Sequence, residues 1–276
     1  MRVEYNNQTR LLAVIGDPIG HSLSPVLHNT MAKVLGLNYL YLACQIPPQK
    51  LQQWLDAVRV MNFAGFNATM PHKLELIPWM DKLTPAAKRH GAVNTVRYED
   101  GLFTGHNTDG DGFARCLEDY GMGFQGARVA VLGAGGAACA IVRKAVDDGA
   151  ASVQVMNRTL ETAAALCAEN PGILHPAPLE APVPPDTNLL INTLPAGAAW
   201  PRHVIGQLPE DCMVCDILYS PRRTPLLQAA ELRGLRTANG LGMLVYQAIY
   251  AFSFFTHVKM DDRDMAKRLL DAVEAL

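Results

Sequence analysis

The chain has 276 residues, more than one hydrophobic core usually serves, so two domains or one large domain is expected. Hydrophobic residues make up 49% of the sequence and charged residues 18%, a balance that excludes a disordered protein. The net charge of -2 argues against a nucleic-acid or anionic-membrane partner. Small molecules are therefore the expected partners.

The N-terminus is polar and is followed by only a short apolar run, so no export signal is expected. The most apolar stretch, residues 243–255, contains Gln247 and falls short of the roughly 20 residues that span a bilayer. Among the cysteines only Cys212 and Cys215 stand close together, and in a strand this spacing puts their side chains on opposite faces. These features predict a cytoplasmic protein with reduced thiols and without a metal site.

Strand-like and helical segments alternate in the first hundred residues, which predicts an α/β unit. Strands are expected at 11–16, 40–46 and 63–70, and helices at 25–36 and 48–62. A second unit follows, whose uniformly apolar strands are typical of a parallel sheet covered on both faces. Its strand, glycine turn and helix at 127–149 are followed by a strand at 151–159, a helix at 161–170 and strands at 188–195 and 212–219.

Three further segments fit around these units. A linker helix is expected to start near Thr108 or Asp109, and the proline-rich residues 174–186 predict a loop, because proline lacks the N–H that strands and helices use. An apolar helix at 241–255 and a charged one from about residue 261 are too small to form a domain alone. They must pack on one of the two units.

A strand, a glycine turn and a helix occur together in ARVAVLGAGGAACAIV, where Gly133, Gly135 and Ala138 match the pattern G-x-G-x-x-A. The first glycine permits the tight turn, the second lets a pyrophosphate approach the backbone, and the small third residue permits close packing of the helix. With a strand before it and a helix after it, the match predicts a dinucleotide site, whose turn also contains Gly136 and Ala137.

The following strand ends in Asn157, Arg158 and Thr159, where NAD enzymes usually carry an acid for the ribose 2′-hydroxyl. A guanidinium at this place favours NADP, because it can pair with the 2′-phosphate. The alternative is that Arg158 is a solvated residue before a helix capped by Thr159. Glu161 would repel a phosphate, so use of NAD stays possible.

Four polar clusters follow apolar strands or end a segment: GHSLSP (20–25), FNATMPHK (66–73), GAVNT (91–95) and GHNTDG (105–110). In open α/β sheets, ligands bind outside the carboxyl ends of the strands. Together the clusters offer hydroxyls, amides, an amine and a carboxylate. This set suits a small polyhydroxylated acid.

Seven motifs in order, namely SLSP, NATMPHK, GAVNT, NTDG, GAGGAA, NRT and NGLGMLVYQ, make the sequence resemble the shikimate (quinate/shikimate) dehydrogenase family over nearly its whole length. The resemblance implies an α/β protein with two domains. An N-terminal substrate-binding and catalytic α/β domain over 1–105, completed by helices in 242–276, would be joined to a Rossmann-type, doubly wound NADP-binding domain over 106–241.

The resemblance also implies roles for single residues. Lys73 and Asp109 would form the catalytic pair, and Gly240, in the last motif, would join the cofactor-binding residues. The residues implied to bind substrate are Ser22, Ser24, Asn67, Thr69, Asn94, Tyr219 and Gln247. The chain departs from strict NADP members of the family at Thr162, where they carry a second basic residue, and in the loop NTLPAG.

Each of these residues also has a purely structural interpretation. Lys73 could be a surface lysine at the start of a helix, and Asp109 could cap a helix or form an Asx turn. Ser24 followed by Pro25 resembles a helix N-cap, and this serine is expected both to cap the helix and to contact the ligand.

The function expected is the reversible reduction of 3-dehydroshikimate to shikimate with NADPH, by a monomer or a homodimer. One alternative is a dehydrogenase for quinate or for a similar or aminated ring acid, with NAD accepted. Another is a non-catalytic sensor that binds a nucleotide and a ring acid.

Overall fold

The computed structural model describes residues 5–276, so the first four residues of the predicted N-terminal domain lie outside the described part. The chain divides into two compact units. Unit 1 joins the residues up to Gly112 with Leu244–Leu276, and unit 2 is Phe113–Met243. Both are built from helices and strands, and the predicted α/β class is confirmed.

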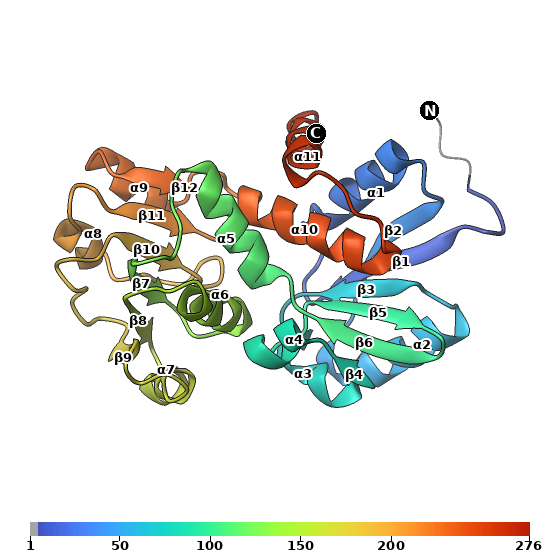
Figure 1. The fold of residues 1–276 in the computed structure, drawn as a ribbon, viewed down its shortest axis with the longest axis horizontal. Helices are drawn as coiled ribbons and strands as arrows, with labels where there is room; N and C mark the ends of the chain where they lie inside the picture. Colours follow the sequence, from blue (N-terminus) through green and yellow to red (C-terminus); the bar gives the residue numbers. More distant parts are fainter. Residues whose placement is uncertain (1–4) are drawn as a thin grey trace. The chain divides into compact units, whose positions relative to one another are not determined.

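Unit 1 contains a six-stranded sheet in the order β2-β1-β3-β5-β6-β4 (Figure 1). β1 pairs in parallel with both β2 and β3, whereas β5 is antiparallel to β3 and to β6. The strands are β1 (Arg10–Gly16), β2 (Tyr39–Gln45), β3 (Gly65–Ala68), β4 (Lys82–Leu83), β5 (Thr95–Glu99) and β6 (Leu102–His106).

The reversal at β5 decides where the polar clusters lie. Because β5 runs against its two neighbours, its beginning lies at the same edge of the sheet as the ends of β3 and β6. The cluster after β3, the cluster before β5 and the cluster after β6 therefore meet at one edge.

The helices of unit 1 cover both faces of this sheet. α2 packs Trp54, Leu55 and Val58 against Ala13 and Phe66 of the sheet, and α11 lies beside α1 (Figure 1). The elements are α1 (Ser24–Leu35), η1 (Pro48–Lys50), α2 (Leu51–Val60), α3 (His72–Glu75), η2 (Ile77–Trp79), α4 (Pro85–His90) and α11 (Asp262–Glu274). Two more helices, α5 (Asp109–Asp119) and α10 (Leu241–Thr256), each have residues in both units. The C-terminal helices thus complete unit 1.

Unit 2 contains a parallel six-stranded sheet in the order β12-β11-β10-β7-β8-β9. Numbered from its own first strand, this is the Rossmann order, in which the direction of winding changes between β7 and β10. The strands are β7 (Arg128–Leu132), β8 (Ser152–Asn157), β9 (Leu174–Pro178), β10 (Leu189–Asn192), β11 (Met213–Asp216) and β12 (Arg236–Ala238), and the helices are α6 (Gly136–Asp147), α7 (Leu160–Cys167), α8 (His203–Gln207) and α9 (Pro225–Leu232).

Successive residues of the unit 2 strands enter two different cores. Val129 and Val131 of β7 belong to one core and Ala130 to the other. Cys215 and Cys212 are divided in the same way, as their odd spacing predicts. The two thiols face opposite sides of the sheet.

Two expectations from the sequence are wrong. The prolines of 174–178 lie in β9 and not in a loop, because β9 is an edge strand. Pro176 and Pro178 are two positions apart, so both ring nitrogens face the open side of the strand, where no ladder donor is needed. The second wrong expectation is that Ser24 is the N-cap of the first helix. Ser24 is instead the first residue of α1, and the N-cap is Leu23.

Candidate active site

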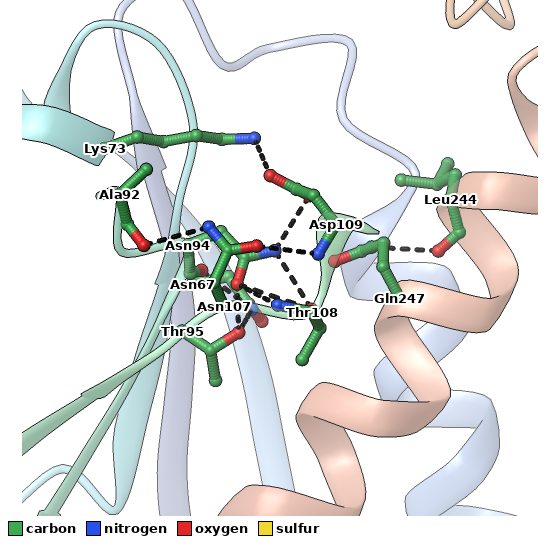
Figure 2. Close-up of polar contacts among 10 residues, drawn as sticks. All are labelled: Asn67, Lys73, Ala92, Asn94, Thr95, Asn107, Thr108, Asp109, Leu244 and Gln247. Atoms are coloured by element: carbon green, nitrogen blue, oxygen red, sulfur yellow. Dashed lines mark hydrogen bonds and ion pairs between the residues drawn. The ribbon is translucent and has the colours of Figure 1, made fainter. Parts of the chain in front are cut away.

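Lys73 and Asp109 form an ion pair at the edge of the unit 1 sheet (Figure 2). The Nζ atom of Lys73 lies 2.6 Å from Oδ2 of Asp109, and the side chains are 18% and 5% exposed. Lys73 belongs to the short helix α3, and its carbonyl accepts a hydrogen bond of 2.8 Å from the N–H of Val93, just before β5. The main chain of Lys73 is therefore held to the segment before β5 and its amine is held by Asp109, so Lys73 is not a solvated surface lysine.

Asp109 is the first residue of α5, and both of its carboxylate oxygens have donors. Asn94 Nδ2 donates to Oδ1 at 2.8 Å, and Lys73 binds Oδ2. The Asx turn expected at this place is made by Asn107 instead, whose Oδ1 accepts from the Asp109 N–H at 3.0 Å. The Asp109 side chain is thus left for Asn94 and Lys73.

Asn67 and Asn94 are both buried beside this pair. Asn67 donates to the Asn94 carbonyl at 3.1 Å and to Thr95 Oγ1 at 2.9 Å, and it accepts from the Tyr41 hydroxyl at 2.7 Å. Asn94 Oδ1 accepts from the N–H of Thr108 at 3.0 Å. Neither Tyr41 nor Thr95 was predicted as a site residue, because a single hydroxyl inside a strand pattern is an ordinary feature.

The predicted serines lie at the start of α1. The expected cap by Ser24 is wrong, because the Ser24 N–H itself donates to Ser22 Oγ at 3.3 Å and no side chain caps the helix. Ser24 is buried, and its side chain hydrogen-bonds to the Tyr41 hydroxyl. Thr69, directly after β3, donates its N–H to the Ile15 carbonyl at 2.9 Å.

Gln247 lies on α10 and turns its amide toward its own helix. Its Nε2 donates to the Leu244 carbonyl at 2.8 Å (Figure 2). A Cβ atom added to Gly112 of α5 would lie 2.7 Å from the main-chain nitrogen of Gln247. The helices α5 and α10 can therefore approach this closely only because residue 112 is glycine. Tyr219, the remaining predicted substrate residue, belongs to unit 2. It lies in the segment that follows β11 and precedes α9 along the chain, and it is partly buried.

The glycine turn of unit 2 has the geometry that a pyrophosphate requires. Gly133 has φ +107°, and a Cβ there would lie 2.5 Å from Thr193 Oγ1. A Cβ at Gly135 would meet no atom within 4 Å, so open space lies at the N-terminus of α6, whose first residues are Gly136 and Ala137. Backbone N–H groups and the positive end of a helix bind anions at such a place. These residues fit a dinucleotide.

The end of β8 carries the residues that would distinguish NADP from NAD. Asn157 Nδ2 donates to the Thr159 carbonyl at 2.8 Å, which shapes the turn into α7. Thr159 is the N-cap of α7 without a capping side-chain bond, and Arg158 is exposed. Elsewhere in unit 2, a Cβ at Gly240 would lie 1.8 Å from the Ile217 carbonyl oxygen, so close backbone approach explains this glycine.

Burial shifts the pKa values of side chains in both units. It lowers the pKa of His28 to about 3 and raises the pKa of Tyr41 well above its ordinary value. The His28 and Tyr41 rings stack with centroids 4.0 Å apart. Burial also raises the pKa of Cys116 to about 11 and that of Cys212 to about 12, which makes these thiols unreactive.

Residues 5–276 lack two features, a membrane-spanning helix and a cluster of metal ligands. None of the described helices has the length and apolar character needed to cross a bilayer. The same residues contain no group of three or more His, Cys, Asp or Glu side chains that could hold a metal ion.

Comparison with known proteins identifies the family. Residues 14–96 match the shikimate dehydrogenase substrate binding domain, residues 117–180 match shikimate / quinate 5-dehydrogenase, and residues 240–270 match the shikimate 5′-dehydrogenase C-terminal domain. The shikimate dehydrogenase (NADP(+)) of Alkaliphilus oremlandii is 38% identical over 92% of this chain and 94% of its own length.

Solved structures agree with this match. The shikimate 5-dehydrogenase of Thermus thermophilus, in complex with NADP(H) and shikimate, has a TM-score of 0.84 and 34% identity over 96% of this chain and all of its own. The enzyme of Listeria monocytogenes, in complex with shikimate and NAD, has a TM-score of 0.84 and 32% identity over 98% and 99% of the two chains. The chain belongs to the shikimate dehydrogenase family.

Proposed function

We propose that this protein catalyses the reversible reduction of 3-dehydroshikimate to shikimate with NADPH. The observation that carries the proposal is the contact of 2.6 Å between Lys73 and Asp109, in a chain whose relatives are shikimate dehydrogenases. A dehydrogenase of this kind needs one group that exchanges a proton with the substrate oxygen and another that orients the substrate. The amine and the carboxylate supply both.

Lys73 would hydrogen-bond to the ketone oxygen, stabilise the negative charge that develops there and deliver the proton. NADPH, when bound, supplies the hydride. Asp109 would hold the Lys73 amine in place through Oδ2 and orient the adjacent substrate hydroxyl. In the direction of oxidation Lys73 would act as the base that receives the proton of the substrate hydroxyl, and the hydride would pass to NADP.

The remaining polar groups would bind the rest of the ring acid. The substrate-binding domain would comprise residues 1–105 and 242–276, most of which belong to unit 1, and residues 106–241 would form the NADP-binding domain. The side chains proposed to contact the substrate are those of Ser22, Ser24, Asn67, Thr69, Asn94, Tyr219 and Gln247. Support for the role of unit 1 comes from the match of residues 14–96 to a substrate binding domain.

The cofactor would be NADP, held at Gly133, Gly135, Gly136 and Ala137, at the end of β8 and at Gly240. The exposed Arg158, beside Asn157 and Thr159, supports this choice because a guanidinium pairs with a 2′-phosphate. Glu161 lies in the first turn of α7 and would oppose the phosphate. NAD is therefore a second candidate, as in the Listeria monocytogenes complex.

Steady-state rates with each combination of shikimate or quinate and NADP or NAD test the function. The proposal expects the highest kcat/KM for shikimate with NADP. A preference for quinate with NAD would favour the quinate alternative. Tight binding of a ring acid without any change in nicotinamide absorbance would favour a sensor.

The protein is proposed to act in the cytoplasm as a monomer or homodimer. Sedimentation of the purified protein distinguishes these two oligomeric states.

A further inference from the structure

A buried chain of four hydrogen bonds connects Tyr41 to Asp109. Tyr41 donates to Asn67 Oδ1 at 2.7 Å, and Asn67 Nδ2 donates to Thr95 Oγ1 at 2.9 Å. Thr95 then donates to Asn94 Oδ1 at 2.8 Å, and Asn94 Nδ2 donates to Asp109 Oδ1 at 2.8 Å. All five residues are buried, with Thr95 fully inaccessible (Figure 2 shows the part from Asn67 onward).

The direction of this chain is fixed by groups that can act in only one way. The Asn67 amide nitrogen faces the main-chain carbonyl of Asn94, which can only accept a hydrogen bond. The side-chain oxygen of Asn67 must therefore face Tyr41. The Asn94 amide oxygen faces the Thr108 N–H, which can only donate, so its nitrogen must face Asp109. The Thr95 hydroxyl accepts a hydrogen bond from the Asn67 N–H, so its own O–H is left to donate to Asn94.

Tyr41 is held firmly at the start of the chain. Asn29 of α1 clamps its main chain, because Asn29 Nδ2 donates to the Tyr41 carbonyl at 3.0 Å and Asn29 Oδ1 accepts from the Tyr41 N–H at 2.9 Å. His28 stacks on the ring. Burial raises the pKa of the Tyr41 hydroxyl, so the group keeps its proton and remains a donor.

We propose that Tyr41 and Thr95 are positioning residues for the reaction, which act on Asp109 through Asn67 and Asn94. Asp109 Oδ1 is the last acceptor of the chain, which leaves Oδ2 directed at Lys73. Hydrogen bonds that all run in one sense polarise one another, so loss of a distant hydroxyl weakens the hold on the carboxylate. This inference rests on the proposed function, because the reaction is the readout of the position of Asp109.

The test compares variants of the full chain in shikimate oxidation with NADP. Thr95→Val removes the hydroxyl and Thr95→Ser keeps it, while Tyr41→Phe removes one oxygen at the far end. Loss of one link should lower kcat/KM about three- to tenfold, and Thr95→Ser should stay within about twofold of wild type. Thr187→Val is the matched control. It removes a buried threonine hydroxyl in unit 2 that has no hydrogen-bond partner among the described residues, so activity should not change.

The double variant Tyr41→Phe/Thr95→Val separates positioning from a general loss of stability. If Tyr41 acts through Thr95, the double variant should be no slower than Thr95→Val alone, because the chain is already broken. Independent losses that multiply would overturn the inference, as would equal damage from Thr95→Ser and Thr95→Val. Should Thr95→Val fail to fold, Tyr41→Phe decides alone, and a loss of kcat/KM below about twofold would overturn the inference.

These outcomes differ from failure of the proposed function. An inactive wild-type protein refutes the function itself. An active wild type whose variants lose activity independently refutes only the chain of hydrogen bonds.

Discussion

At the scale of single residues, the candidate site depends on how the two oxygens of Asp109 are shared. One accepts from the Asn94 amide and the other from the Lys73 amine. A buried carboxylate that loses its cation leaves a charge without compensation, which costs several kcal/mol in typical proteins. Burial of the Asp109 carboxylate therefore favours its ion pair with Lys73. The same burial would also limit the access of water to the proposed reaction.

Arg158 is proposed to bind the cofactor, and its replacement should affect the binding of NADP and of NAD differently. Arg158→Ala should weaken binding of NADP by about 10-fold or more, since it removes a charge-assisted bond to the 2′-phosphate, and should leave NAD almost unaffected. The KM values for both cofactors measure this difference. Arg263→Ala, at an exposed position of α11, is the control and should change neither value. Equal weakening of NADP and NAD would remove the phosphate role from Arg158.

His28 gives a prediction for the dependence of stability on pH. The folded chain keeps this ring neutral, with a pKa of about 3, whereas the unfolded chain protonates it below its ordinary value of 6.5. The unfolded state therefore binds more protons, and stability should fall as the pH drops from about 6.5 toward 4, with His28 alone contributing at most about 1.4 kcal/mol per pH unit. Burial also lowers the pKa of His106 to about 4, so it adds to the same loss.

Urea unfolding between these pH values measures the slope. His28→Phe keeps the stacked ring and removes the titrating group, so its stability should fall less steeply than that of wild type. His175→Gln, at an exposed position, should retain the wild-type slope. A His28→Phe slope as steep as wild type would contradict the assignment.

Motifs that joined several chemical groups predicted which side chains lie close together, whereas the position of isolated residues could not be predicted. Lys73, Asn94 and Asp109 come from three separate motifs, and the structure brings them within hydrogen-bond distance. Tyr41 could not be predicted, because its role depends on the pairing of β2 beside β1 and on the side chain of Asn67. Only the folded sheet reveals that arrangement.

At the scale of elements, α5 and α10 meet through a glycine. A Cβ at Gly112 would lie 2.7 to 2.9 Å from the backbone and Cβ of Gln247, closer than unbonded atoms can come. Gly112→Ala should therefore force the helices apart, lower stability by about 1–3 kcal/mol and raise the KM for shikimate through displacement of Gln247.

The control for this change is the same substitution in another helix. Gly206 of α8 is exposed, and a Cβ there would meet no atom within 4 Å, so Gly206→Ala should be neutral or stabilise by up to about 1 kcal/mol. Thermal unfolding and KM values compare the two variants. If Gly112→Ala behaves like Gly206→Ala, the close contact does not determine the position of α10.

The elements that the sequence did not predict have local causes. The β5–β6 hairpin turns at Asp100 and Gly101, which both have positive φ. A type I′ turn requires positive φ at both central residues, and Asp-Gly is a preferred pair for it. The strand β9 escaped prediction because its prolines argue against a strand unless it lies at the edge of a sheet. By contrast, the linker helix was expected near Asp109 and begins there.

At the scale of the whole molecule, the C-terminal helices return to the unit that the N-terminal residues begin. The charged helix α11 lies beside α1 because it has an apolar face to bury, formed by Met265, Leu269 and Val273. Length predicted two domains or one large domain, and the family resemblance carried by the motifs implied that the last residues complete the first domain. Hydrophobic periodicity shows that a helix has an apolar face and does not identify its partner.

The most direct test of the account compares wild type with Lys73→Ala in shikimate oxidation with NADP. Wild type should reduce NADP, and Lys73→Ala should lower kcat by about 10²–10⁴-fold with little change in KM, because the lost group acts on the developing charge. Lys82→Ala, at an exposed lysine of β4, should match wild type. A Lys73→Ala variant that keeps its kcat and only raises KM would make Lys73 a binding residue, and would contradict the proposed role of the pair.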